Sequence, residues 1–244
     1  MHPATAHLIV LPGGGYASHA PHEAEPIVAW LSAPGLSASV FRYPLQVRYP
    51  EPLLALRAEI RRRREQGAER IGVIGFSAGG HLAGLAALAP GDDPRESVQF
   101  AVLGYAITSM ETETYRPARL ILLGEDASPD LRRRTSLDAL VTEASPPFFL
   151  WHTAEDMYVP PEHTYRLASA LAAYEVPHTV HVFAHGPHSL GAVSRARRAE
   201  RVEQARPTAI RTGGAAPGGQ PRVHPIGCSR RSDRPGSSSW GWRR

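Results

Sequence analysis

The chain has 244 residues, of which 42% are hydrophobic and 20% are charged, so it holds enough apolar residues to bury a sizeable core. This composition excludes a wholly disordered protein, and with Cys228 as the single cysteine it excludes a disulfide scaffold. The formal net charge is +4, but residues 193–244 carry 12 of the 27 basic residues and only three acidic ones, so the preceding part of the chain is acidic.

Short apolar runs rich in β-branched and aromatic residues predict six strands. Near-continuous apolarity of this kind is typical of strands that are covered on both faces. In chain order the runs are 7–11, 38–43, 71–76, 99–105, 148–152 and 179–184. Helical spacing between them predicts helices over 21–33, 51–66, 78–89 and 162–173. Alternating strands and helices predict an α/β fold, with a mostly parallel sheet and helices on both of its faces.

The composition also predicts how the chain is divided. We predict an α/β domain over residues 1–193, in which residues 106–147 interrupt the alternation of strand and helix. We interpret 106–147 as an insertion of helices and loops over the carboxyl edge of the sheet, near the candidate active site. Residues 194–244 are rich in Pro, Gly, Ser and Arg. Such a tail buries too little apolar surface to offset its ordering entropy, so we predict that it is largely disordered.

Targeting and partner signals are few. The first residues carry no positively charged region before a short apolar run, and no stretch reaches the 18 apolar residues of a membrane span. We therefore predict a cytoplasmic protein with no membrane partner. The basic tail would attract anionic surfaces, but no nucleic-acid-binding motif accompanies it, so we predict no dedicated nucleic-acid partner.

The strongest chemical signal is the sequence GFSAG at residues 75–79, where a predicted strand ends and a predicted helix begins. A serine on a sharp turn between strand and helix projects its hydroxyl away from both elements, and small flanking residues let the backbone close that tightly. This pattern predicts Ser77 as a nucleophile. The alternative is a glycine-rich turn with an incidental serine.

The second signal is the sequence LPGGGY at residues 11–16, directly after the first predicted strand. Attack on an ester creates an oxyanion, which is stabilised by N–H groups that are already held in place. Consecutive glycines present backbone amides without a Cβ in the way. We therefore predict that amides of this glycine loop form an oxyanion hole, together with the amide of Ala78, the residue after the serine, at the positive end of its helix. A phosphate-binding loop is the alternative, although neither GxGxxG nor a Walker pattern is present.

A serine nucleophile needs a base, and the base needs an acid that orients it. With a GxSxG turn, the expected chain order is serine, then an acidic residue, then histidine, each after a later strand. Asp156 follows the strand at 148–152 and is the predicted acid, with Glu155 as its rival. His188 follows the last predicted strand and is the predicted base, with His185 as its rival.

The four segments LPGGGY, GFSAGGHLAG, PPFFLWHTAEDMYVP and HVFAHGPHSLG together resemble the α/β-hydrolase superfamily, especially small esterases of the acetylxylan esterase and carbohydrate esterase type. The resemblance covers residues 6–193. It implies a Ser-His-Asp triad, an acyl-enzyme intermediate, and hydrolysis of small-molecule carboxylic esters with a small acyl group, acetylated carbohydrates among them. It implies no metal and no cofactor. The residues that it implies are Ser77, His188 and Asp156, with the oxyanion-hole amides of Gly14, Gly15 and Ala78.

The sequence departs from this family in three places. Pro12 stands where many relatives have the histidine of an HGGG sequence, which removes one supporting side chain. Only about ten residues precede the glycine loop, whereas many relatives have two further strands there, so we expect a sheet shortened at one edge. Relatives also follow the catalytic histidine with a closing amphipathic helix. Here the basic tail follows instead, so we expect that helix to be shortened or altered, with apolar sheet surface left exposed.

Two other functions are compatible with the same motifs. A peptidase of the prolyl oligopeptidase type shares the serine turn and the order of the triad, but it usually carries a large additional domain for which this chain has no room. A degenerate, inactive hydrolase is the other alternative, and the unusual C-terminal sequence is the feature that favours it.

Overall fold

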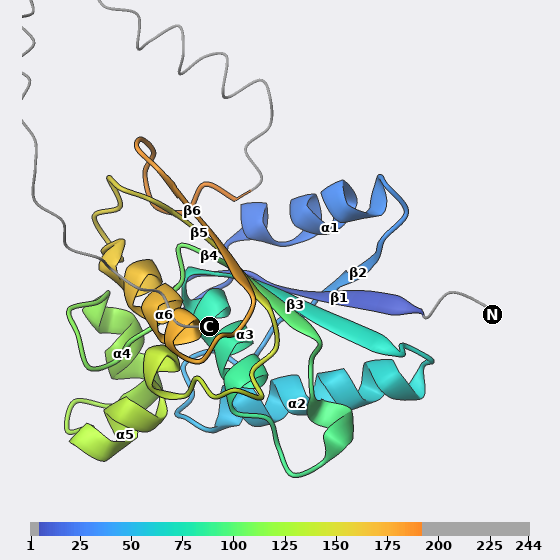
Figure 1. Ribbon diagram of the computed structural model, residues 1–244, viewed down its shortest axis with the longest axis horizontal. Helices are drawn as coiled ribbons and strands as arrows, with labels where there is room; N and C mark the ends of the chain where they lie inside the picture. Colours follow the sequence, from blue (N-terminus) through green and yellow to red (C-terminus); the bar gives the residue numbers. More distant parts are fainter. Residues whose placement is uncertain (1–4, 192–244) are drawn as a thin grey trace, which may run out of the picture. The chain divides into compact units, whose positions relative to one another are not determined.

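The computed structural model describes residues 5–191, in which six strands form one parallel sheet (Figure 1). The order of the strands across the sheet is β2-β1-β3-β4-β5-β6, and every neighbouring pair is parallel. The strands are β1 (Ala6–Leu11), β2 (Ser37–Val40), β3 (Arg70–Phe76), β4 (Phe100–Gly104), β5 (Phe148–Thr153) and β6 (His178–Phe183). Because all six run the same way, their carboxyl ends meet at one edge of the sheet. The α/β fold with a parallel sheet is thus confirmed.

Helices cover both faces of this sheet, as predicted. One face packs against α2 (Glu51–Glu65), α3 (Ser77–Leu88) and α6 (Glu162–Ala173), whose buried leucines share a core cluster with alternate residues of the strands. The opposite face packs against α1 (Glu25–Ser32), which contributes Ile27 and Leu31 to a second cluster. Figure 1 shows α1 on one side of the sheet and α2 and α3 on the other.

Most predicted elements lie within a few residues of their observed bounds, and the differences have local causes. The predicted helix over 21–33 is divided into a 3-10 turn, Pro21–Glu23, and α1, because Ala24 has a ψ of −109° that no helix accommodates. The predicted strand over 38–43 ends at Val40, although the Phe41 amide still donates to Val10 of β1. The strand thus ends three residues before the apolar run does.

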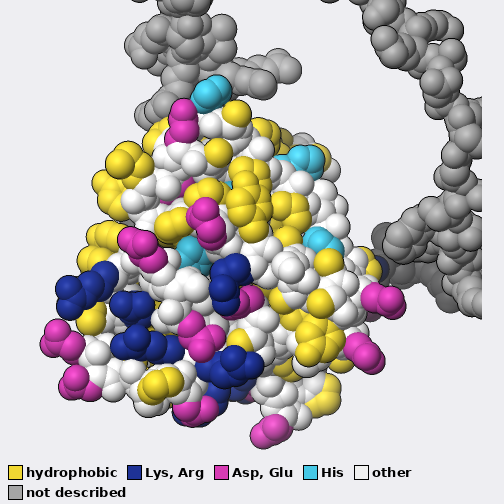
Figure 2. Space-filling view, turned by 60° about the vertical axis from the view of Figure 1, so that its left-hand side comes forward, with side chains coloured by type: hydrophobic (Ala, Val, Ile, Leu, Met, Phe, Trp, Pro, Cys, Tyr) yellow, Lys and Arg dark blue, Asp and Glu magenta, His cyan; other side chains and the backbone are white. Residues whose placement is uncertain are grey.

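The interpreted insertion, residues 106–147, contains two short helices, α4 (Arg116–Leu123) and α5 (Pro129–Arg134), and a 3-10 turn, Leu137–Ala139. Figure 2 shows a face on which arginine and acidic side chains intermingle in the lower part and hydrophobic side chains prevail above. In α5, Arg134 pairs with Asp130 at 2.8 Å, and both side chains are exposed. This arginine therefore contributes to a solvated surface.

The face of the sheet opposite α3 is only partly covered within residues 5–191. Phe149 of β5 and Phe183 of β6 are 39% and 53% exposed, and both flank His181, whose ring lies 5.4 Å and 6.3 Å from theirs. Within the same residues no strand precedes β1. The tail over 194–244, with its predicted disorder, and the expected closing helix lie outside the described residues. None of the helices within residues 5–191 has the length and apolarity that crossing a bilayer requires.

Candidate active site

Ser77 lies at the junction of β3 and α3, in a backbone conformation that is rare for a serine. Its φ is +52°, in the left-handed region, whereas the preceding Phe76 is extended. Such strain persists only where surrounding structure enforces it, and it is found mostly at functional sites. A Cβ on Gly75 would lie 2.3 Å from the Gly79 carbonyl oxygen, so the turn closes only because these flanking residues lack side chains. The Ser77 side chain thereby emerges at the carboxyl edge of the sheet.

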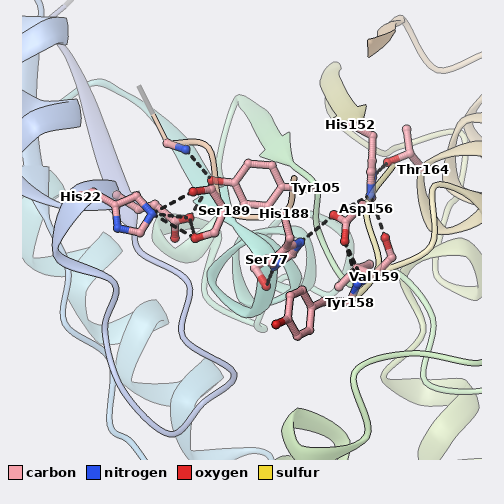
Figure 3. A network of polar contacts seen from close by, with 12 residues as sticks. His22, Ser77, Tyr105, His152, Asp156, Tyr158, Val159, Thr164, His188 and Ser189 are labelled. Carbon is pink, nitrogen blue, oxygen red and sulfur yellow. Dashed lines mark hydrogen bonds and ion pairs between the residues drawn. The ribbon is translucent and has the colours of Figure 1, made fainter. Parts of the chain in front are cut away.

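The three predicted triad residues come together at this edge (Figure 3). His188 Nε2 lies 2.9 Å from Ser77 Oγ, and His188 Nδ1 lies 2.6 Å from Asp156 Oδ2. Because the carboxylate only accepts, the imidazole proton is on Nδ1, and the Ser77 hydroxyl donates to the bare Nε2. A serine, a base and an acid are thus connected in series, as proton abstraction from a hydroxyl requires.

Asp156 is held as an ionised acceptor. Its Oδ1 accepts from the amides of Tyr158 and Val159 at 2.9 and 3.0 Å. Burial alone raises the pKa of Asp156, but hydrogen bonds from His152, His188 and the Val159 amide outweigh burial and hold this pKa below its ordinary value. The carboxylate is therefore charged at neutral pH, where it orients the imidazole and stabilises an imidazolium.

His152 is a site residue that the sequence did not indicate. Its ring is fully buried, with Nε2 2.9 Å from the Val159 carbonyl and 3.2 Å from Asp156 Oδ2, while the Thr164 hydroxyl lies 2.7 Å from Nδ1. Since both partners of Nε2 are acceptors, Nε2 carries the proton and donates toward Asp156. A histidine inside an apolar strand has no sequence signal that separates this contact from ordinary core packing.

The rival residues form a pair of their own at the surface. His185 Nδ1 contacts Glu155 Oε1 at 2.9 Å, and the His185 side chain is 86% exposed. Glu155 Oε2 also accepts from the Gly186 amide. The structure therefore brings Asp156 and His188 to Ser77, whereas Glu155 and His185 contact each other instead.

The glycine loop lies directly beside this serine. A Cβ on Gly13 would lie 3.0 Å from the Ser77 Cβ, and Gly14 and Gly15 have φ values of +122° and +64° that favour glycine. The Gly13 amide donates to Glu23, but within residues 5–191 the amides of Gly14 and Gly15 donate to no protein acceptor. Ala78 is in the first turn of α3, where helix amides lack intrahelical partners. The amides predicted to form the oxyanion hole therefore lie in the loop and the helix turn next to Ser77.

Close packing between α3 and the glycine loop predicts that Gly79→Ala destabilises the protein. A Cβ on Gly79 would lie 2.3 Å and 2.4 Å from the backbone oxygens of Leu11 and Pro12. Helix propensity alone would make alanine more stable by about 1 kcal/mol, so the two effects have opposite signs. We expect a loss of about 3 kcal/mol in the free energy of unfolding, measured by thermal or urea denaturation. Ala87→Gly in the same helix is the control, and we expect it to lose only the difference in helix propensity, about 1 kcal/mol. An unchanged or raised denaturation midpoint for Gly79→Ala would contradict the prediction.

Comparisons with known proteins agree with this geometry. Residues 64–171 match the family described as BD-FAE. The chain is 36% identical to the crystal structure of an acetyl ester-xyloside bifunctional hydrolase from Caldicellulosiruptor lactoaceticus, with a TM-score of 0.74 over 84% of this chain and 83% of that one. It is 29% identical to a carboxylesterase from Lactobacillus plantarum, with a TM-score of 0.68 over 79% and 76% of the two chains.

A curated relative adds a more distant likeness. Over 203 residues the chain is 28% identical to endo-1,4-beta-xylanase B from Butyrivibrio fibrisolvens. The aligned region covers 75% of this chain but only 32% of that protein. The chain thus corresponds to about a third of that relative. The parallel sheet and the strained serine turn agree with the similarity to the hydrolase from Caldicellulosiruptor. The chain therefore belongs to the α/β-hydrolase superfamily, among its small esterases of the acetylxylan esterase and carbohydrate esterase type.

Proposed function

We propose that this protein is a serine esterase that hydrolyses carboxylic esters with a small acyl group, acetylated carbohydrates among them, through Ser77, His188 and Asp156. The observation that carries the proposal is the continuous contact from Asp156 through His188 to Ser77, at 2.6 and 2.9 Å, beside a loop of glycine amides. Family membership supports the reaction class, and the relative named as an acetyl ester-xyloside hydrolase supports the acetyl group and the sugar.

The reaction proceeds in two halves. In the first, Ser77 Oγ attacks the ester carbonyl carbon while its proton moves to His188 Nε2. The negative charge that develops on the carbonyl oxygen is stabilised by the amides of Gly14, Gly15 and Ala78. When the tetrahedral intermediate collapses, the carbon–oxygen bond to the alcohol breaks, and His188 gives its proton to the departing alkoxide. The acyl group is left as an ester of Ser77.

In the second half, water hydrolyses the acyl-enzyme. His188 Nε2 takes a proton from the water as the water oxygen attacks the acyl carbon, and the same amides stabilise the second oxyanion. Collapse breaks the bond to Ser77 Oγ, which recovers its proton from His188, and the carboxylic acid leaves. Asp156 stays ionised throughout and stabilises the imidazolium in both halves.

Two tyrosine rings favour a small acyl group. Tyr115 lies across the glycine loop, with its Cε1 3.0 Å from where a Cβ on Gly15 would be, and Tyr158 lies 5.7 Å from the His188 ring. The two tyrosine rings meet edge to face at 5.9 Å. Tyr158 thus lies beside the base and Tyr115 beside the glycine loop, and we infer that together they narrow the approach to Ser77.

A panel of p-nitrophenyl esters tests the proposal. We expect kcat/KM for the acetate to exceed that for the octanoate by roughly tenfold or more, because a long chain meets the two rings. Release of acetate from peracetylated xylose, measured by coupled assay, tests the carbohydrate as the alcohol part. A proline p-nitroanilide serves as the amide substrate, and we expect no cleavage of it. Absence of hydrolysis of every ester would overturn the proposal, and preference for the octanoate would overturn the small acyl group alone.

A further inference from the structure

Glu23 is a fully buried glutamate outside the triad whose carboxylate joins segments from distant parts of the sequence. Its exposed fraction is 0%. One oxygen, Oε2, accepts from the Gly13 amide at 2.7 Å. The other, Oε1, accepts from the Tyr105 hydroxyl at 2.6 Å and from the Ser189 hydroxyl at 2.7 Å. Burying a carboxylate is costly unless it is well hydrogen-bonded, so these three donors account for its presence in the interior.

Two of the donors are chain neighbours of residues in the proposed reaction. Gly13 directly precedes Gly14 of the oxyanion loop, and Ser189 directly follows the base His188. Ser189 has a φ of +64°, so the loop after His188 is held in a conformation that its sequence does not favour. A single carboxylate therefore connects the loop that stabilises the oxyanion to the loop that carries the imidazole.

Tyr105 provides a third connection. Its ring lies 4.9 Å from the His188 ring at 66°, and its hydroxyl oxygen accepts from the Gly191 amide at 2.9 Å. Burial, together with the Glu23 carboxylate, raises the pKa of Tyr105 well above its usual range, so the phenol keeps the proton that it donates to Glu23. Figure 3 shows Tyr105 and Ser189 next to His188, on the side away from Asp156.

We infer that Glu23 is a positioning residue, whose carboxylate holds the glycine loop and the His188 loop at the relative position that the reaction at Ser77 requires. The inference rests on the proposed ester hydrolysis. Asp156 orients His188 from one side, and Glu23 fixes it from the other through Ser189 and Tyr105. Because the glycine amides and the imidazole act mainly in the transition state, loosening this link lowers kcat and leaves KM nearly unchanged.

Glu23→Gln tests the inference without a large change in volume. The donors from Gly13 and Ser189 bind different oxygens of Glu23, and a glutamine amide has only one oxygen. If that oxygen keeps the Gly13 amide, the NH₂ group faces the Ser189 and Tyr105 hydroxyls, which then have to accept instead of donate. In the other orientation the Gly13 amide loses its acceptor, so the variant alters the link in either case and removes its charge. We expect kcat for p-nitrophenyl acetate to fall by about tenfold, with KM within about threefold of wild type. Glu25→Gln is the matched control: this glutamate lies two residues further on, exposed and paired with Arg42, and we expect wild-type kinetics.

Ser189→Ala removes the same link from its other end. We expect it to lower kcat in the same direction, and we expect the double variant, Glu23→Gln with Ser189→Ala, to lose less than the product of the two single losses. If Glu23 only stabilised the fold, its substitution would leave kcat per folded molecule unchanged, and the effect on kcat would not depend on Ser189. A kcat for Glu23→Gln within twofold of wild type, or losses that multiply in the double variant, would overturn the inference.

A crystal structure of Glu23→Gln separates this inference from the proposed function. We expect the distance between Ser77 Oγ and His188 Nε2 to lengthen from 2.9 Å to beyond hydrogen-bond range, about 3.5 Å. If wild type hydrolyses esters but the variant keeps both its kcat and this distance, only the role of Glu23 is rejected. If wild type hydrolyses no ester, the proposed function is rejected, and the distance in the variant alone decides whether Glu23 positions His188.

Discussion

Ser77→Ala is expected to lower kcat for p-nitrophenyl acetate by about 10⁴-fold or more. Without Oγ no acyl-enzyme forms, and the hydrolysis that remains comes from the oxyanion amides and from binding alone. The Ser77 side chain is largely buried, and an alanine at this position removes only the hydroxyl, so we expect the variant to fold. A fluorophosphonate probe followed by mass spectrometry should modify the peptide that contains Ser77 in wild type and leave it unmodified in the variant.

His188→Ala is expected to lower kcat to a similar extent, because Ser77 loses its proton acceptor, which lies 2.9 Å away. His185→Ala is the control, since His185 lies three residues earlier in the same loop but contacts Glu155 at the surface. We expect its kcat to stay within about twofold of wild type. Equal activity in wild type and Ser77→Ala, or a large loss in His185→Ala, would contradict this assignment.

Asp156→Asn is expected to lower kcat by about 10³- to 10⁴-fold while leaving the fold in place. The asparagine oxygen can still accept from the amides of Tyr158 and Val159, which places its NH₂ group opposite both His188 Nδ1 and His152 Nε2. A donor there favours the imidazole tautomer with its proton on Nε2, and this tautomer cannot accept the proton of Ser77. We expect the midpoint of thermal unfolding to stay close to that of wild type, in contrast to the large loss in kcat.

The neighbouring acid supplies the control for that variant. Glu155→Gln changes a carboxylate one residue earlier, whose partners are His185 and the Gly186 amide. We expect wild-type kcat for Glu155→Gln. A loss in this variant comparable to that of Asp156→Asn would mean that the acid had been assigned to the wrong residue.

Hydrophobic pattern predicted the sheet closely, because the central strands β1 and β3 are buried on both faces and are therefore apolar along their length. The run at 71–76 lies within β3 (Arg70–Phe76), and the run at 148–152 lies within β5 (Phe148–Thr153). The bounds differed where a single residue changes the backbone direction, as at Ala24. Such a change depends on what the neighbouring side chain contacts, and here that neighbour is the buried Glu23.

The serine turn and the glycine loop were also predictable, because their function demands backbone geometry that only small residues allow. The selection of the acid and the base depended on their position after particular strands, and the sequence alone left Glu155 and His185 as rivals. That Asp156 and His188 catalyse stays a prediction until the variants are measured. The structure adds that each rival contacts the other, which no local sequence pattern encodes.

Local sequence by itself determined which segments are strands and helices, where the backbone turns tightly, and which residue types can supply a hydroxyl, an imidazole and a carboxylate. Only the tertiary structure decided which of several acids and histidines meet, and that Glu23 and His152 have contacts at the site. The physical reason is that periodicity and glycine placement reflect interactions within a few residues of the chain. A buried hydrogen bond between residues 166 positions apart, such as Ser189 to Glu23, depends on how the whole sheet assembles.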